Sequence, residues 1–97
     1  MHRLLLPALV CALLQAGPTA AAEMPPGASS CTGCHAATKI PDSVIPRIAG
    51  RKASDIVTAM REFRSGSLQS SVMGRIAKGF TDPQIDAIAA WFAAQPE

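Results

Sequence analysis

The sequence predicts a small all-α fold, and three observations lead to that expectation. Two segments, residues 53–67 and 81–95, place apolar side chains at the three- and four-residue spacing of a helix. No stretch alternates apolar with polar residues as a half-buried strand does. The chain has only 97 residues, so it forms at most one domain and its limited core requires an additional stabilising element.

The first 22 residues have the composition of a secretory signal peptide. Arg3 provides a positive start, an apolar run covers residues 4–14, and three alanines at 20–22 form a small-residue cleavage site. The apolar run is shorter than the roughly 20 residues that cross a bilayer, which argues against a membrane anchor. We therefore expect cleavage between Ala22 and Glu23, which leaves a periplasmic domain of residues 23–97.

Cleavage would change the cysteine count and the charge. Cys11 leaves with the signal peptide, so Cys31 and Cys34 remain, and the formal charge falls from +2 to +1 with the loss of Arg3. This charge gives no support to nucleic-acid binding. Residues 47–78 carry seven basic and two acidic side chains, and two interpretations stay open: solvated helix faces, or a surface that docks an acidic partner.

The motif CTGCH, residues 31–35, concentrates two thiols and an imidazole. A structural zinc site takes four ligands, whereas only three cysteine or histidine residues remain after cleavage. A thioredoxin-like dithiol requires strands that the pattern does not predict. Covalent attachment of haem c uses every residue of the motif: Cys31 and Cys34 form thioethers and His35 binds iron. Positions i, i+3 and i+4 share one helical face, so one turn presents all three groups to one cofactor.

The segment after the motif, residues 36–50, is predicted to be a loop around the cofactor, because it contains Pro41, Pro46 and Gly50 without helical periodicity. A metal-bound imidazole usually donates its second N–H to a carbonyl or carboxylate. The Pro46 carbonyl is the candidate acceptor for His35.

Two longer helices follow. The first is predicted to start at Ser54 or Asp55 as N-cap and to end at Gly66, with Ile56, Met60 and Phe63 on its apolar face. The second is predicted from a capping box of Thr81 and Gln84, with Pro83 in the first turn. Its apolar face comprises Ile85, Ile88, Ala89 and Phe92.

The second axial ligand must be a methionine, because residues 23–97 contain no second histidine. Met24 lies too close to Cys31 in a segment rich in proline and glycine, and Met60 belongs to a helical stripe where methionine usually fills the core. Met73 lies far from His35 in sequence, in a segment bounded by serine and glycine, and is the favoured ligand. An apolar cavity is expected around the haem, lined by a set such as Ile40, Ile48, Met60, Phe63 and Ile76.

The combination of CTGCH, PRIAG (46–50), the Met73 segment and AWF near the C-terminus resembles class I cytochromes c. The resemblance implies that Pro46 supports His35, that Met73 ligates iron, and that Trp91 packs on a small residue, Gly27 or Ala28. Two further strings are AMREFRSG and MGRIAKGF, and MGRIAKGF is more specific than the CTGCH motif. They are similar to the single-haem cytochrome subunit of flavocytochrome c sulfide dehydrogenase, which implies a sulfide-oxidising flavoprotein as partner.

The functional expectation is periplasmic electron transfer by a His/Met-ligated haem c, with no catalytic site of its own. Two alternatives stay open. The same fold would serve a freely diffusing cytochrome that shuttles electrons between respiratory complexes. A haem protein that binds a small molecule would require Met73 to be absent from the iron or to leave it.

Overall fold

The computed structural model describes residues 23–97, and the predicted signal peptide of residues 1–22 lies outside this part. Four helices follow one another: α1 (Ala28–Thr32), α2 (Ala53–Ser65), α3 (Met73–Ala77) and α4 (Asp82–Ala93). Within residues 23–97 there is no strand, so the all-α prediction is confirmed. None of the described helices is long and apolar enough to cross a bilayer.

Helix α4 forms as its sequence predicts. The Thr81 hydroxyl accepts a hydrogen bond from the Gln84 N–H at 3.4 Å, and the Gln84 side chain accepts one from the Thr81 N–H at 2.9 Å. This capping box satisfies two N–H groups that a helix start leaves unpaired, and Pro83 fits the first turn because it lacks an N–H. The predicted apolar face is buried: Ile85, Ile88, Ala89 and Phe92.

Helix α2 ends as predicted but starts earlier than predicted. Gly66 terminates it with a left-handed backbone, φ +85°, which glycine adopts at low cost. The N-cap is Lys52, whose carbonyl accepts from the N–H groups of Asp55 and Ile56 at 3.1 and 3.2 Å. The predicted cap at Ser54 or Asp55 was wrong, because the helix starts without any side-chain cap and these residues lie in its first turn.

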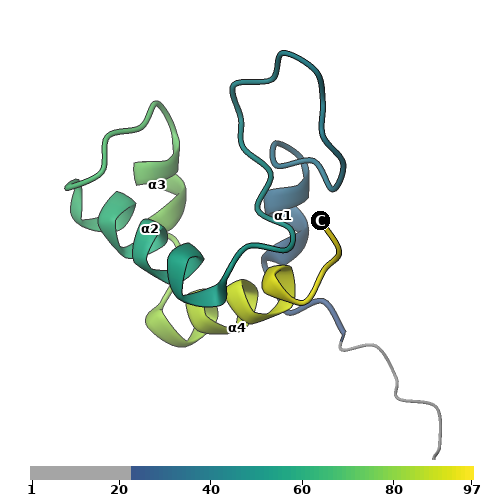
Figure 1. The fold of residues 1–97 in the computed structure, drawn as a ribbon. Coiled ribbons are helices and arrows are strands. Elements are labelled where there is room, and N and C mark those ends of the chain that lie inside the picture. Colours follow the sequence, from purple (N-terminus) through teal and green to yellow (C-terminus); the bar gives the residue numbers. More distant parts are fainter. Residues whose placement is uncertain (1–22) are drawn as a thin grey trace, which may run out of the picture.

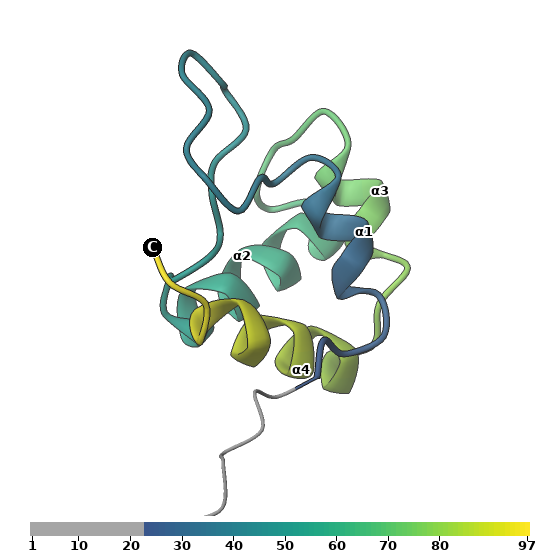
Figure 2. The same cartoon turned by 90° about the vertical axis from the view of Figure 1, so that its right-hand side faces the viewer.

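The core lies where α2, α4 and the start of α1 meet (Figures 1 and 2). Its buried cluster consists of Ala28, Ile56, Ile88, Ala89 and Phe92. Gly27 is required there, because a Cβ at this position would come within 2.7 Å of the Phe80 ring. The aromatic ring against Gly27 is therefore that of Phe80, while Trp91 lies at the border of the core, edge-on to Phe92 at a centroid distance of 4.9 Å.

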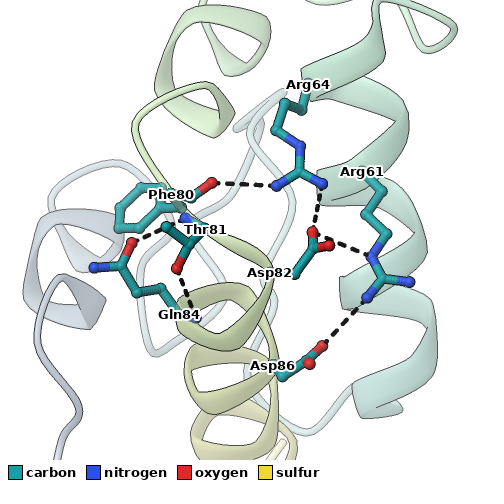
Figure 3. Close-up of polar contacts among 7 residues, drawn as sticks. All are labelled: Arg61, Arg64, Phe80, Thr81, Asp82, Gln84 and Asp86. Carbon is teal, nitrogen blue, oxygen red and sulfur yellow. Dashed lines mark hydrogen bonds and ion pairs between the residues drawn. The ribbon is translucent and has the colours of Figure 1, made fainter.

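Charged side chains connect the outer surfaces of α2 and α4 (Figure 3). Arg64 contacts the Asp82 carboxylate and also donates to the Phe80 carbonyl at 3.2 Å. Arg61 lies 3.7 Å from Asp82 and 3.7 Å from Asp86. The hydrogen bond from Arg64 is the main reason that the pKa of Asp82 lies below its ordinary value. Two of the seven basic residues between 47 and 78 are thus neutralised by carboxylates of α4.

Two loops extend away from α4, one over residues 36–49 and the other over residues 66–72 (Figure 1). The end of the first loop is held against the C-terminal end of α4, because the Gly50 N–H donates to the Phe92 carbonyl at 2.9 Å. Gly50 has φ +77°, and a side chain there would overlap Glu97. The end of the first loop is therefore anchored to the helical core at Gly50.

Candidate functional site

The CTGCH motif lies on a single turn at the end of α1. The Cys31 carbonyl accepts hydrogen bonds from the Cys34 N–H at 3.3 Å and from the His35 N–H at 2.8 Å. The helical path therefore continues past Thr32, and the two thiols and the imidazole emerge from adjacent positions. Cys31 is half-buried and Cys34 is exposed, and neither forms a disulfide. Burial raises the pKa of the Cys31 thiol, and a hydrogen bond with Ser30 offsets part of this effect.

The ring of His35 is oriented by the loop that follows it. Its Nδ1 atom lies 2.5 Å from the Pro46 carbonyl oxygen. A carbonyl only accepts, so Nδ1–H is the donor of this hydrogen bond and Nε2 is the nitrogen left to bind a metal. This is the tautomer that a metal-ligating histidine uses when a carbonyl holds its other nitrogen. The structure thus brings the predicted acceptor, Pro46, to the predicted ligand.

Two cavities of about 240 and 360 Å³ open between α1, α2 and the two loops. They share five lining residues: Cys31, His35, Pro46, Phe63 and Met73. We refer to the pair as the His35–Met73 cavity. Its further walls are mainly apolar and come from α2, α4 and both loops: Ile48, Ile56, Met60, Leu68, Ile85 and Ile88 in one part, Val44, Ile45, Val72 and Ile76 in the other.

The three candidate methionines occupy different positions. Met73 is the first residue of α3 and lines both parts of the His35–Met73 cavity. Met60, interpreted from sequence as core filler, lines one part, and Met24 is 42% exposed and lines neither. Of the apolar residues expected around the cofactor, Ile40 does not line this cavity, because it lies further out on the first loop and is 53% exposed.

Sequence reasoning missed the charged groups of the cavity. Arg51 and Asp55 line the smaller part, one turn apart across the start of α2. The sequence held a signal for Asp55, because Asp55 and Ala59 are four residues apart and so share a face of α2. The smaller part of the cavity is therefore apolar except near the start of α2, where Arg51 and Asp55 border it.

These residues fit a haem c. The motif supplies two thiols for the vinyl groups and an imidazole whose Nε2 is free, and a thioether comes from a segment far away in sequence. The walls between them are apolar, as a porphyrin ring requires. Met60 also lines the smaller part together with His35, whereas Met73 lines both parts and starts α3, far from His35 in the sequence.

Comparison with known proteins found related chains. The protein is 48% identical over 63 residues to the cytochrome subunit of sulfide dehydrogenase from Chlorobaculum tepidum, which covers 65% of this chain and 57% of that protein. It is 34% identical over 95 residues to a thiosulfate dehydrogenase electron acceptor from Thiomonas intermedia, over 96% of this chain and 44% of that protein. A second thiosulfate dehydrogenase electron acceptor, from Stutzerimonas stutzeri, is 34% identical over 73 residues, 73% of this chain and 34% of that protein.

No family model matches the chain. The chain spans about half the length of the curated relatives it matches, 57%, 44% and 34%. One of these relatives is the cytochrome subunit of a sulfide dehydrogenase, and two are thiosulfate dehydrogenase electron acceptors. By its sequence similarity, its all-α fold and its CTGCH cavity, this chain resembles small c-type cytochromes such as the cytochrome subunit of sulfide dehydrogenase.

Proposed function

We propose that this protein is a periplasmic electron-transfer cytochrome that accepts electrons from a sulfide-oxidising flavoprotein. In this proposal one haem c is bound covalently through Cys31 and Cys34, and His35 and Met73 are its axial ligands. The observation that carries the proposal is that these four residues, from segments about forty positions apart in the sequence, line one apolar cavity.

The bound haem would supply a one-electron iron couple. The chain's own residues then have four tasks. The Cys31 and Cys34 sulfurs anchor the ring, and the Pro46 carbonyl keeps the proton of His35 on Nδ1 so that Nε2 remains a ligand. The Met73 thioether would be the second protein ligand of the iron, which would leave no open position for a substrate. The apolar walls exclude water and stabilise the less charged, reduced state.

The electron donor is proposed to dock where the cavity reaches the surface beside Cys34. Four apolar residues from the two loops and α3 surround this opening and are partly or fully exposed: Val44 (96%), Ile45 (43%), Val72 (54%) and Ile76 (39%). Arg75, exposed on α3, forms no ion pair within residues 23–97. An apolar contact flanked by a basic residue fits a partner whose rim carries acidic side chains.

The test is a visible spectrum of the protein isolated gently from its native periplasm, recorded before and after adding sulfide. Flavin absorbance together with sulfide-reduced haem bands is the expected result. Haem bands without flavin and without rapid reduction would overturn the flavoprotein proposal in favour of a freely diffusing carrier. Absence of haem bands, or a polypeptide mass without one added haem, would overturn the assignment of Cys31 and Cys34.

A variant pair locates the docking surface. Val44→Asp places a carboxylate in the proposed apolar contact, so reduction by the sulfide-oxidising partner should slow while reduction by dithionite stays unchanged. Ile40→Asp is the matched control, because Ile40 is exposed on the same loop but does not line the cavity. Equal slowing in both variants would contradict this docking surface.

Two relatives support a second donor. Both thiosulfate dehydrogenase electron acceptors match this chain at 34% identity, and one match covers 96% of this chain. The same preparation is therefore challenged with thiosulfate in a parallel cuvette. Haem reduction by thiosulfate but not by sulfide would assign the protein to a thiosulfate-oxidising system.

A further inference from the structure

A cavity separate from the proposed haem site lies between the first loop and the C-terminal end of α4. Its volume is about 440 Å³, within the range of small-molecule sites. His35 is the one residue that it shares with the His35–Met73 cavity. The Gly50–Phe92 hydrogen bond joins the loop to α4 beside this cavity, so its two walls are held together by backbone contact.

Arg47 is the residue that points to a ligand. It lines this cavity, and its Nε atom is buried without a hydrogen-bond partner among the described residues. Buried polar atoms are almost always paired, because an unpaired donor costs about 1–3 kcal/mol. Arg47 lines neither part of the His35–Met73 cavity, and the only other pocket that it borders within the described residues, beside Cys34, has a volume of about 10 Å³ and is too small for an organic ligand.

The other walls define the chemistry of the ligand. Trp91 supplies most of the aromatic surface, because Phe92 borders the cavity but is only 3% exposed, and alanines of the first loop add apolar walls beside the polar side chains of Thr32, Thr38 and Gln95. Two cationic side chains, Lys39 and Arg47, stand against one carboxylate side chain, Glu97. Guanidinium groups bind carboxylates and sulfonates through paired, charge-assisted hydrogen bonds.

We propose that this cavity binds a small organic anion with a flat apolar body, such as an aromatic carboxylate or sulfonate, whose acidic group pairs with Arg47. The aromatic part lies against Trp91 and Phe92, and Lys39 adds charge attraction at the entrance. This inference does not depend on the proposed function, because it rests on residues that the proposed haem site does not use.

The test uses 2-naphthoate as the probe and the intact cytochrome as isolated. Calorimetric titration should show saturable 1:1 binding. In nitrogen-15 spectra, the Arg47 Nε–H and the Trp91 indole N–H should shift together along the same saturation curve. Absence of saturation up to millimolar concentrations, or shifts confined to the exposed residues Val44 and Ile45, would overturn the proposal.

Two variants show whether Arg47 is responsible. Arg47→Gln should weaken 2-naphthoate binding about tenfold, the loss expected for one charge-assisted hydrogen bond. Arg75→Gln is the matched control, because Arg75 lies on α3 and does not line this cavity. This variant should bind 2-naphthoate with the same affinity as the unmodified protein. Equal affinity of the Arg47 variant and the control would refute the pairing.

A third variant, Lys39→Gln, and a second probe keep the test decisive if Arg47→Gln does not fold. Lys39→Gln changes an exposed side chain and should weaken binding several-fold. The neutral probe 2-acetylnaphthalene has a similar shape without the charge and should bind at least tenfold more weakly than 2-naphthoate. Equal affinity for the two probes would show a non-specific apolar pocket and overturn the anion site.

Discussion

The side of the molecule where α2 packs on α4 is built differently from the side formed by the two loops. On the helical side, Ile56, Ile88 and Phe92 are buried against one another, and the arginines above them are paired with aspartates. On the loop side, Val44 is almost fully exposed and Val72 is half exposed, and apolar side chains border a cavity.

The difference teaches how such a short chain divides its apolar residues. One set contacts other parts of the polypeptide and stabilises the fold by its own burial. The other set lines the His35–Met73 cavity, and Ile56 and Ile88 belong to both sets because they are part of the core cluster and also border the cavity. Substitutions should therefore affect stability mainly on the helical side and the spectrum mainly on the loop side.

The largest effect is expected for Met73→Ala in the haem-loaded protein. Loss of the thioether should abolish the weak far-red absorption band of iron(III) bound to methionine. Met60→Leu is the matched control, because Met60 lines the same cavity and the swap conserves volume. Survival of the band in Met73→Ala, or its loss in Met60→Leu alone, would refute the assignment of the axial ligand.

Phe92→Ala should give the largest loss of stability on the helical side. Phe92 is 3% exposed within the core cluster, and truncation of a buried phenylalanine costs about 3–5 kcal/mol of the free energy of unfolding. Val44→Ala is the contrast on the loop side and should change this free energy by less than about 0.5 kcal/mol. Urea unfolding followed by circular dichroism measures both, and similar losses would contradict the division between the two sides.

Thr81→Ala should have a smaller effect. It removes the hydroxyl that caps α4 and should lower the free energy of unfolding by about 1 kcal/mol. Thr58→Ala, at an exposed position within α2, should be neutral or slightly stabilising because alanine has the higher helix propensity. A loss of equal size in both variants would mean that the capping box is not the cause.

The smallest effect is expected for Asp82→Asn and depends on pH. Arg64 lowers the pKa of Asp82 in the folded state, so the ionised carboxylate adds stability above the ordinary aspartate pKa of about 4 and loses it as pH falls through the lower folded value. At pH 7 the melting temperature of the variant should therefore be slightly lower than that of the unmodified protein. Near pH 2 the two should converge, and a constant difference across this range would contradict the linkage.

How well a feature could be predicted from sequence depends on how far apart in the chain its interacting residues lie. The start of α4 was predictable because Thr81 and Gln84 are three residues apart and cap each other locally. The start of α2 was not, because Lys52 caps with its backbone alone and leaves no side-chain signature. Sequence spacing also indicated the turn that carries Cys31, Cys34 and His35, since their contacts span four residues.

Long-range pairing was the part that sequence could not provide. For the excess of positive charge between residues 47 and 78, the sequence left open solvated helix faces or a docking surface, and it did not indicate that Arg61 and Arg64 pair with Asp82 and Asp86 on another helix. The sequence also did not indicate that the Phe80 ring packs against Gly27, because the position of Phe80 depends on the path that the chain takes into α4. That two methionines line the cavity also depends on how α2 faces α3, which no local pattern encodes.

The hydrogen bond between Gly50 and Phe92 implies an order of folding. It joins residues far apart in the chain, and closing so long a loop carries an entropic cost. The ion pairs between α2 and α4 span fewer residues, so we expect the Gly50–Phe92 hydrogen bond to form after these two helices have met. The segment that bears CTGCH should then attach last to a helical unit that already exists. Pulse-labelled amide exchange during refolding should show protection in α2 and α4 before protection of the Gly50 and His35 N–H groups.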